Sequence, residues 1–248
     1  MSEKIVYGIH AVDLLLKKSV DQIDKIYLQA NRQDGKAQKL ISLAAKHKIP
    51  VVRWDKTKLD AITTENHQGV IAELKQTGSL VQTEHDLYEL VEQSEKPITL
   101  LILDGVTDPH NLGACFRTAD AAGVDAIVVP KDKSVGLNAT VRKVACGAAE
   151  TVPFYAVTNL VRALKTLQDL GVWILGTAGE AEQDIYQTRF SGNLALVMGA
   201  EGKGMRRLTR EHCDELFHIP MLGSVSSLNV SVATGVCLFE ILRQRNSS

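Results

Sequence analysis

The second part of the chain alternates apolar runs with segments of helical periodicity. The first run, Ile98 to Asp104, is almost unbroken, which is typical of a strand buried on both faces of a sheet. Comparable strand-like runs follow at residues 126–130, 151–157, 172–177, 194–198 and 216–220. Because strands that alternate with helices and short loops build a parallel sheet covered on both sides, the pattern predicts an α/β domain over residues 98–248.

The first 76 residues form a smaller α/β pattern with its own apolar periodicity. They carry 13 basic and 9 acidic residues, whereas residues 77–97 carry one basic and five acidic residues and lose most of the periodicity. This shift in charge predicts a first domain over 1–76, a linker over 77–97 with a short helix in it, and a second domain over 98–248. The difference in charge is modest, and an ordinary solvated surface is the alternative explanation for it.

Composition excludes several classes of protein. Hydrophobic residues make up 45% and charged residues 23% of the 248 residues, as expected of a folded globular chain. No apolar run reaches the roughly 18–20 residues of a membrane span. The first residues lack the basic and apolar blocks of a signal peptide, so a cytoplasmic location is expected. Four cysteines without a C-x-x-C pair give no support to a metal site.

Polar residues gather in the loop after the first strand of the second domain. Ligands bind at the carboxyl ends of strands in open parallel sheets, which makes Asn111 and Arg117 candidates for a site. Two structural alternatives stay open at this point. Asn111 suits a helix N-cap, and Arg117 is spaced for a surface ion pair with Asp120.

Two further loops have the composition of a ligand site. The first, 199–205, places Glu201 among three glycines but matches neither the Walker A nor the dinucleotide-binding pattern. A tight structural turn is the alternative. The second, 219–229, is uncharged and contains Ser227 and Asn229 before a closing helix expected over 227–244. A helix N-cap is again the structural alternative, and the absence of G-x-S-x-G disfavours a serine hydrolase.

Taken in order, three motifs resemble a known family. They are Asn111-x5-Arg117, the stretch Val197–Gly204, and the stretch Ile219–Ala233. Together they are similar to the SpoU/TrmH branch of the SPOUT methyltransferases. In the first domain, residues 7–11 (Tyr-Gly-Ile-His-Ala) and 67–72 (His-Gln-Gly-Val-Ile-Ala) resemble the subgroup of bacterial 23S rRNA guanosine 2′-O-methyltransferases.

The resemblance implies a fold and an activity. The second domain would be a SPOUT-type, trefoil-knotted parallel-sheet domain, preceded by a small L30e-like α/β RNA-binding domain. The enzyme would be a homodimer that methylates the ribose 2′-hydroxyl of a guanosine in the peptidyl-transferase P loop of 23S rRNA. The methyl donor would be S-adenosylmethionine, with no metal, no membrane and no DNA involved. The rRNA would be presented free or within a pre-ribosomal particle.

The resemblance also implies site residues by their motif positions. The catalytic set would be Asn111, Arg117, Glu201, Ser227 and Asn229. The donor would be held mainly through backbone groups of Gly199, Ile219, Met221 and Leu228, with Thr177 as an additional candidate. Arg117 would act either as a base or as a clamp on the adjacent phosphate. A guanidinium stays protonated in proteins, which favours the clamp. RNA would contact basic residues of the first domain, with these candidates: Lys4, Lys17, Lys18, Lys25, Arg32 and Lys36.

Three other functions remain open on the sequence. A tRNA ribose 2′-O-methyltransferase of the same family would share every catalytic motif. A non-catalytic RNA-binding ribosome-assembly factor would not need the complete set of motif residues that this chain has. An enzyme acting on nucleotide phosphates would use the 199–204 glycines, although the G-K-[ST] of a P-loop is missing.

Overall fold

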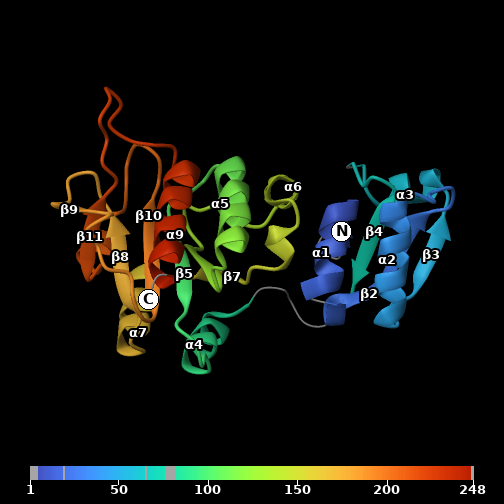
Figure 1. Ribbon diagram of the computed structural model, residues 1–248, viewed down its shortest axis with the longest axis horizontal. Helices are drawn as coiled ribbons and strands as arrows, with labels where there is room; N and C mark the ends of the chain where they lie inside the picture. The colour runs from blue at the N-terminus through green and yellow to red at the C-terminus, as the bar shows by residue number, and fades with distance from the viewer. Residues whose placement is uncertain (1–4, 19, 65, 76–81, 247–248) are drawn as a thin grey trace. The chain divides into compact units, whose positions relative to one another are not determined.

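The computed structural model describes residues 5–64, 66–75 and 82–246, apart from residue 19 (Figure 1). The chain divides into two compact units. The first consists of residues 1–80 together with 146–151, and the second of residues 81–145 and 152–248. None of the described helices is both long and apolar enough to cross a membrane.

The first unit is built on a four-stranded mixed sheet. Its elements are β1 (Ile5–Tyr7), α1 (Ile9–Lys18), the 3-10 turn η1 (Val20–Gln22), β2 (Ile23–Gln29), α2 (Gly35–Lys46), β3 (Val51–Trp54), α3 (Lys56–Ile62), β4 (Val70–Leu74) and the 3-10 turn η2 (Ala148–Glu150). The strand order is β1-β4-β2-β3, in which only β2 and β3 run parallel. Apolar residues of α1 and α2 cover one face of this sheet and form its main core.

The second unit is built on a seven-stranded sheet whose neighbouring strands are all parallel. Its strands are β5 (Thr99–Asp104), β6 (Ala126–Pro130), β7 (Phe154–Val157), β8 (Trp173–Thr177), β9 (Gln183–Asp184), β10 (Leu194–Gly199) and β11 (Glu215–His218). The order is β7-β6-β5-β10-β8-β11-β9. Every residue of β5 is buried, as its apolar run predicts.

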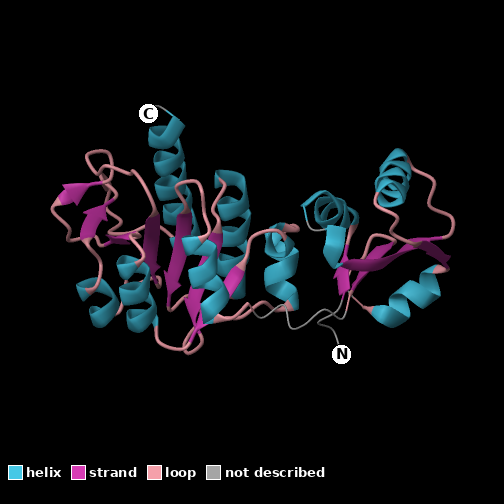
Figure 2. Cartoon of the chain, turned by 90° about the horizontal axis from the view of Figure 1, so that it is seen from below, coloured by secondary structure: helices cyan, strands magenta, loops and turns pink. Residues whose placement is uncertain are grey.

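Helices cover both faces of this sheet (Figure 2). They are α4 (Glu84–Glu92), α5 (Pro109–Ala122), α6 (Ala139–Ala145), α7 (Leu160–Asp169), α8 (Arg207–Glu211) and α9 (Val230–Asn246). Helices α4 and α7 pack on one face in a common apolar cluster. Helices α5 and α9 lie side by side (Figure 1), where the Cys115 thiol meets the buried hydroxyl of Thr234.

Helix α4 lies inside the segment 77–97 for which the sequence predicts a linker. Thr83 begins it with a capping box to Asp86, and its apolar side chains Leu87 and Val91 belong to the core of the second unit. The sequence therefore contains a local signal for the start of this helix, the pair Thr83 and Asp86. The domain boundaries at 76 and 98 stay predictions, and the structure adds that α4 packs with the second unit.

Glycine at position 113 permits the close packing of α5 on α6. A Cβ atom at Gly113 would lie 2.6 Å from Cβ of Val144 and 2.9 Å from the carbonyl oxygen of Val141. We expect Gly113→Ala to lower the free energy of unfolding by about 1–3 kcal/mol, the usual cost of overpacking. Gly136→Ala is the control, since a Cβ atom at Gly136 would have nothing within 4 Å. Urea unfolding of both variants measures the difference, and equal stabilities would contradict the prediction.

Candidate functional site

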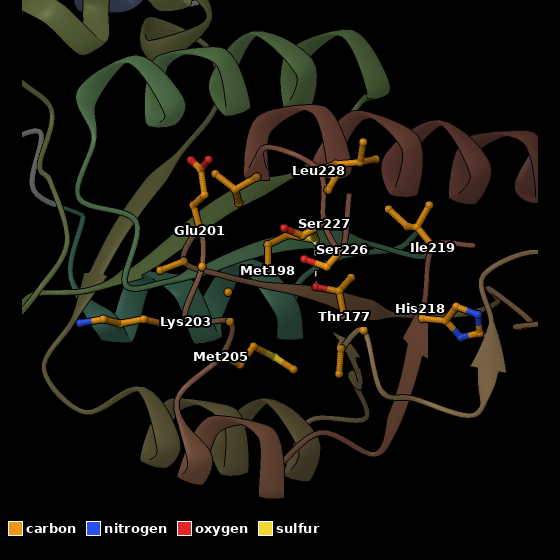
Figure 3. A pocket seen from close by; sticks show the side chains of 18 of the residues that line it. Thr177, Met198, Glu201, Lys203, Met205, His218, Ile219, Ser226, Ser227 and Leu228 are labelled. Atoms are coloured by element: carbon orange, nitrogen blue, oxygen red, sulfur yellow. Dashed lines mark hydrogen bonds between the residues drawn. The ribbon is translucent and has the colours of Figure 1, made fainter. Parts of the chain in front are cut away.

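A cavity of about 620 Å³ opens at the carboxyl ends of β8, β10 and β11. Three segments form most of its wall: the start of the loop after β8, the glycine-rich loop after β10, and the loop between β11 and α9 (Figure 3). Arg210 of α8 and the first turn of α9 complete it. Seven of the ten residues proposed from the sequence lie in its wall, namely Thr177, Gly199, Glu201, Ile219, Met221, Ser227 and Leu228. The motifs thus converge on one cavity, as the position of ligand sites in parallel sheets predicts.

The glycine-rich loop is a closed turn. Ala200 and Gly204 exchange two backbone hydrogen bonds of 3.1 and 2.8 Å, and Gly202 has a φ of +76°, which glycine adopts without strain. A Cβ atom at Gly199 would lie 2.2 Å from the carbonyl carbon of Gly204. The turn presents Glu201 on the side of α5 and α9 (Figure 3).

Asn229 joins the three motifs. Its Nδ2 donates to Oδ1 of Asn111 at 3.0 Å and to Oε2 of Glu201 at 3.3 Å. Its Oδ1 accepts from the backbone N–H of Ser231 at 2.9 Å and from the hydroxyl of Ser231 at 2.6 Å. Both ends of the amide are therefore engaged, which fixes its orientation.

The N-cap alternative for Asn111 is wrong. Helix α5 begins earlier, with Asp108 as N-cap and Pro109 at its first position. Asn111 lies inside the first turn, and its side-chain oxygen accepts the hydrogen bond from Asn229. Helix α9 begins at Val230, so Ser227 is not its cap either. The Asn229 carboxamide oxygen binds the first turn of α9.

Arg117 stands apart from this network. It lies on the exposed side of α5 and is not part of the cavity wall. Its side chain makes no hydrogen bond or ion pair with another residue in the described ranges. The structure thus brings together Asn111, Glu201 and Asn229 but leaves the guanidinium of Arg117 unengaged.

The cavity wall also contains residues that sequence analysis missed. Met198, Lys203, Met205 and His218 line it (Figure 3). Nδ1 of His218 is buried and has no hydrogen-bond partner among the residues that the structure describes. The only signal in the sequence was the position of His218 at the end of a strand.

The cysteines offer no reactive thiolate near the site. Burial raises the pKa of Cys115 to about 11 and the pKa of Cys213 to about 12. These thiols therefore stay protonated at neutral pH, which disfavours nucleophilic catalysis by either. Within the described part of the chain, no group of three or more His, Cys, Asp or Glu residues is placed to hold a metal ion.

Several candidate RNA contacts of the first unit are engaged within the protein. Lys17 pairs with Asp13 at 2.6 Å, and Lys25 pairs with Glu73 at 3.4 Å. Arg32 binds Asp34 at 2.6 Å and also the carbonyl of Gln68. Lys36 is exposed. Lys4 and the side chain of Lys18 fall outside the described residues.

Two family models match the chain. The model of the SpoU rRNA methylase family covers residues 98–239. The model "RNA 2′-O ribose methyltransferase substrate binding" covers residues 5–78. The two matched regions follow one another along the chain, so the resemblance involves both units.

Curated relatives are similar over nearly their whole length. The 23S rRNA (guanosine-2′-O-)-methyltransferase RlmB of Pseudomonas aeruginosa is 61% identical, over 97% of this chain and 96% of that protein. The protein of the same name from Escherichia coli K12 is 55% identical, over 99% of this chain and all of that protein.

Solved structures share the fold. The SpoU methyltransferase AviRb of Streptomyces viridochromogenes, in complex with AdoMet, has a TM-score of 0.77 at 21% identity, over 98% of this chain and 91% of that one. The AdoMet-bound rRNA methyltransferase of Sinorhizobium meliloti has a TM-score of 0.73 at 24% identity, over 97% and 87%. They confirm the predicted SPOUT-type α/β fold class with a preceding small α/β domain. The chain belongs to the SpoU rRNA methylase family.

Proposed function

We propose that the protein transfers a methyl group from S-adenosylmethionine to the ribose 2′-hydroxyl of one guanosine in the peptidyl-transferase P loop of 23S rRNA. The observation that carries this proposal is the junction at Asn229, where three separate motifs meet beside a single cavity. The names of relatives at 55–61% identity agree with the reaction and with the type of RNA.

The cavity fits the methyl donor. Its volume of about 620 Å³ lies within the usual range for small-molecule sites. Its wall combines apolar side chains, such as Met198 and Leu228, with the polar side chains of Thr177 and Ser227. We propose that Thr177, Gly199, Ile219, Met221 and Leu228 hold the donor. When bound, it supplies an electrophilic methyl group, so no metal is needed.

The residues around Asn229 then orient the acceptor. Methyl transfer needs the ribose oxygen in line with the bond that breaks. Asn111 and Glu201 are held by the same Asn229 amide, while Ser227 lines the cavity beside them. We assign these four residues to positioning the ribose next to the donor. The Glu201 carboxylate is exposed and is available to accept a hydrogen bond from a hydroxyl group.

Arg117 acts in this proposal as a clamp on an RNA phosphate. Its guanidinium is exposed and unengaged within the described ranges, and a planar fork of donors suits a phosphate. We expect Arg117→Ala to lower the methylation rate by about 100-fold through loss of positioning. We expect Arg117→Lys to recover part of the rate, because a cation remains. A rate in Arg117→Ala equal to that of the unchanged protein would contradict the assignment.

The direct test uses methyl-labelled S-adenosylmethionine and 23S rRNA that lacks its natural modifications. Label on a single guanosine ribose in the P loop is the expected result. Label on total tRNA alone, offered in parallel, would favour the tRNA enzyme of the same family. Label only on isolated pre-ribosomal particles would identify those particles as the substrate. Absence of donor binding would favour a non-catalytic RNA-binding assembly factor.

We further propose that the protein acts as a homodimer in the cytoplasm, where rRNA is modified. Val232 and Phe239, seven residues apart on one side of α9, are 53% and 49% exposed. In the loop before α9, Leu222 and Val225 are also exposed. Exposed large apolar side chains that gather on one helix and the loop before it are typical of a protein contact surface. Sedimentation equilibrium of the protein and of Phe239→Asp tests the dimer, and a monomeric mass for the unchanged protein would exclude it.

A further inference from the structure

The end of the glycine-rich loop binds a buried carboxylate that lies outside the three sequence motifs. Asp104, the last residue of β5, is 1% exposed. Its Oδ2 accepts the backbone N–H of Arg206 at 2.8 Å, and its Oδ1 accepts Nε of Arg206 at 2.6 Å. The second guanidinium nitrogen of Arg206 also lies 2.6 Å from Oδ1. Asp104 thus holds both the backbone and the side chain of the residue that follows the loop.

The entrance of the same loop is also held by β5. In the parallel pairing of β10 with β5, Gly199 is in register with Asp104. The loop therefore leaves the sheet at Gly199 and returns to the same point at Arg206. Between Gly199 and Arg206, the Ala200–Gly204 hydrogen bonds close the turn. Glu201 therefore lies on a loop that is bound to β5 at both of its ends.

Asp104 also begins the loop that leads to Asn111. The next residue, Gly105, has a φ of +85°, and a Cβ atom there would lie 3.7 Å from Cβ of Ala200. The loop that leads into α5 and the loop that carries Glu201 thus start side by side at Asp104. The Asn229 amide spans the gap between those two residues, with bonds of 3.0 and 3.3 Å.

We infer that Asp104 and Arg206 are positioning residues that set the separation between Asn111 and Glu201. This inference rests on the proposed function for the role of those two residues. A buried charge is stable only when it is paired and hydrogen-bonded. Here the partner is Arg206, the residue that follows the glycine-rich loop. Neither Asp104 nor Arg206 lines the donor cavity, so each acts through the loop.

The test measures single-turnover methylation at saturating donor. We expect Asp104→Asn and Arg206→Ala each to lower the rate by about 10-fold or more, because small displacements in a reacting geometry are costly. The double variant should be no slower than the slower single variant, since residues that act as one unit are not additive. Arg206→Lys should restore part of the rate. Asp125→Asn is the matched control, because Asp125 accepts the backbone N–H of Thr99 at the opposite end of β5.

Amide hydrogen exchange gives a readout that does not depend on activity. The N–H of Gly204, bonded to Ala200, should exchange faster in Asp104→Asn and at an unchanged rate in Asp125→Asn. If Asp104→Asn does not fold, Arg206→Ala provides a milder comparison, because it removes the guanidinium contacts and keeps the backbone N–H bond to Asp104. Unchanged rates and exchange would overturn the inference, as would a lower melting temperature with an unchanged rate. If the unchanged protein methylates no RNA, the proposed function fails, and loop exchange still decides the role of Asp104.

Discussion

Asn229→Asp should lower the methylation rate by about 100-fold or more and leave the protein folded. The substitution keeps the shape of the side chain. One oxygen still accepts the two hydrogen bonds from Ser231, so the start of α9 is preserved. The other oxygen replaces the Nδ2 donor and faces two acceptors, Oδ1 of Asn111 and the carboxylate of Glu201.

The expected loss follows from charge and geometry. Two carboxylates at this distance repel each other, so Glu201 should move away from position 229. Asn111 can keep a hydrogen bond there only by turning its amide over to donate Nδ2, which changes the atom that it presents. A displacement of about 1 Å in a reacting geometry costs on the order of 100-fold in rate. Single-turnover methylation at saturating donor measures the effect, and circular dichroism checks the fold.

Asn159→Asp is the matched control. Asn159 is the N-cap of α7, where its side chain accepts the N–H of Arg162 at 3.1 Å, and aspartate serves equally well at an N-cap. Its methylation rate should equal that of the unchanged protein. If Asn229→Asp is as active as this control, the hydrogen bonds of Asn229 have no part in the reaction.

The sequence predicts six of the seven strands of the large sheet, missing only the two-residue β9, and it proposes a site at their carboxyl ends. Buried strands such as β5 consist of long apolar runs, and the carboxyl ends of β5 and β10 carry Asp104 and Gly199, from which the two motif loops leave the sheet. Both features are local in the chain and depend on general rules for parallel sheets. They could therefore be predicted without knowing which strands are neighbours.

Features that depend on tertiary contacts could not be predicted in this way. Asn111 and Asn229 are 118 positions apart, and only the packing of α5 against α9 brings them together. The packing of α4 is a second case, because the core that buries Leu87 is supplied by β7 and α7. The start of α5 is different, since Asp108 followed by Pro109 is a local helix-start signal that lies three residues before Asn111.

The closing helix shows the same limit. On periodicity alone, its buried face would be the apolar stripe of Leu228, Val232, Val236, Phe239 and Leu242. The core of the second unit instead receives Val230, Cys237 and Ile241. Because a helix that is apolar on two sides gives no single stripe, the sequence could not decide which side faces the sheet. The outward side is the one that we assign to the dimer.

Gly199→Ala should strongly weaken donor binding while leaving the second unit folded. The added Cβ atom would lie 2.2 Å from both the carbonyl carbon of Gly204 and the amide nitrogen of Met205. Real Cβ atoms do not approach backbone this closely, so one segment must move. The strand β10 is paired on both sides with β5 and β8, whereas Gly204 is exposed. The turn will therefore be displaced rather than the strand.

Displacement of the turn changes the wall of the cavity and the position of Glu201. We expect the dissociation constant for S-adenosylmethionine to rise by at least about 100-fold, which corresponds to roughly 2.8 kcal/mol. Isothermal titration calorimetry measures it, with Gly136→Ala as a control that adds the same methyl group in open space. Because binding is measured without RNA, the result tests the donor site separately from the substrate. Donor affinity in Gly199→Ala equal to that of the control would show that the donor does not rest on this turn.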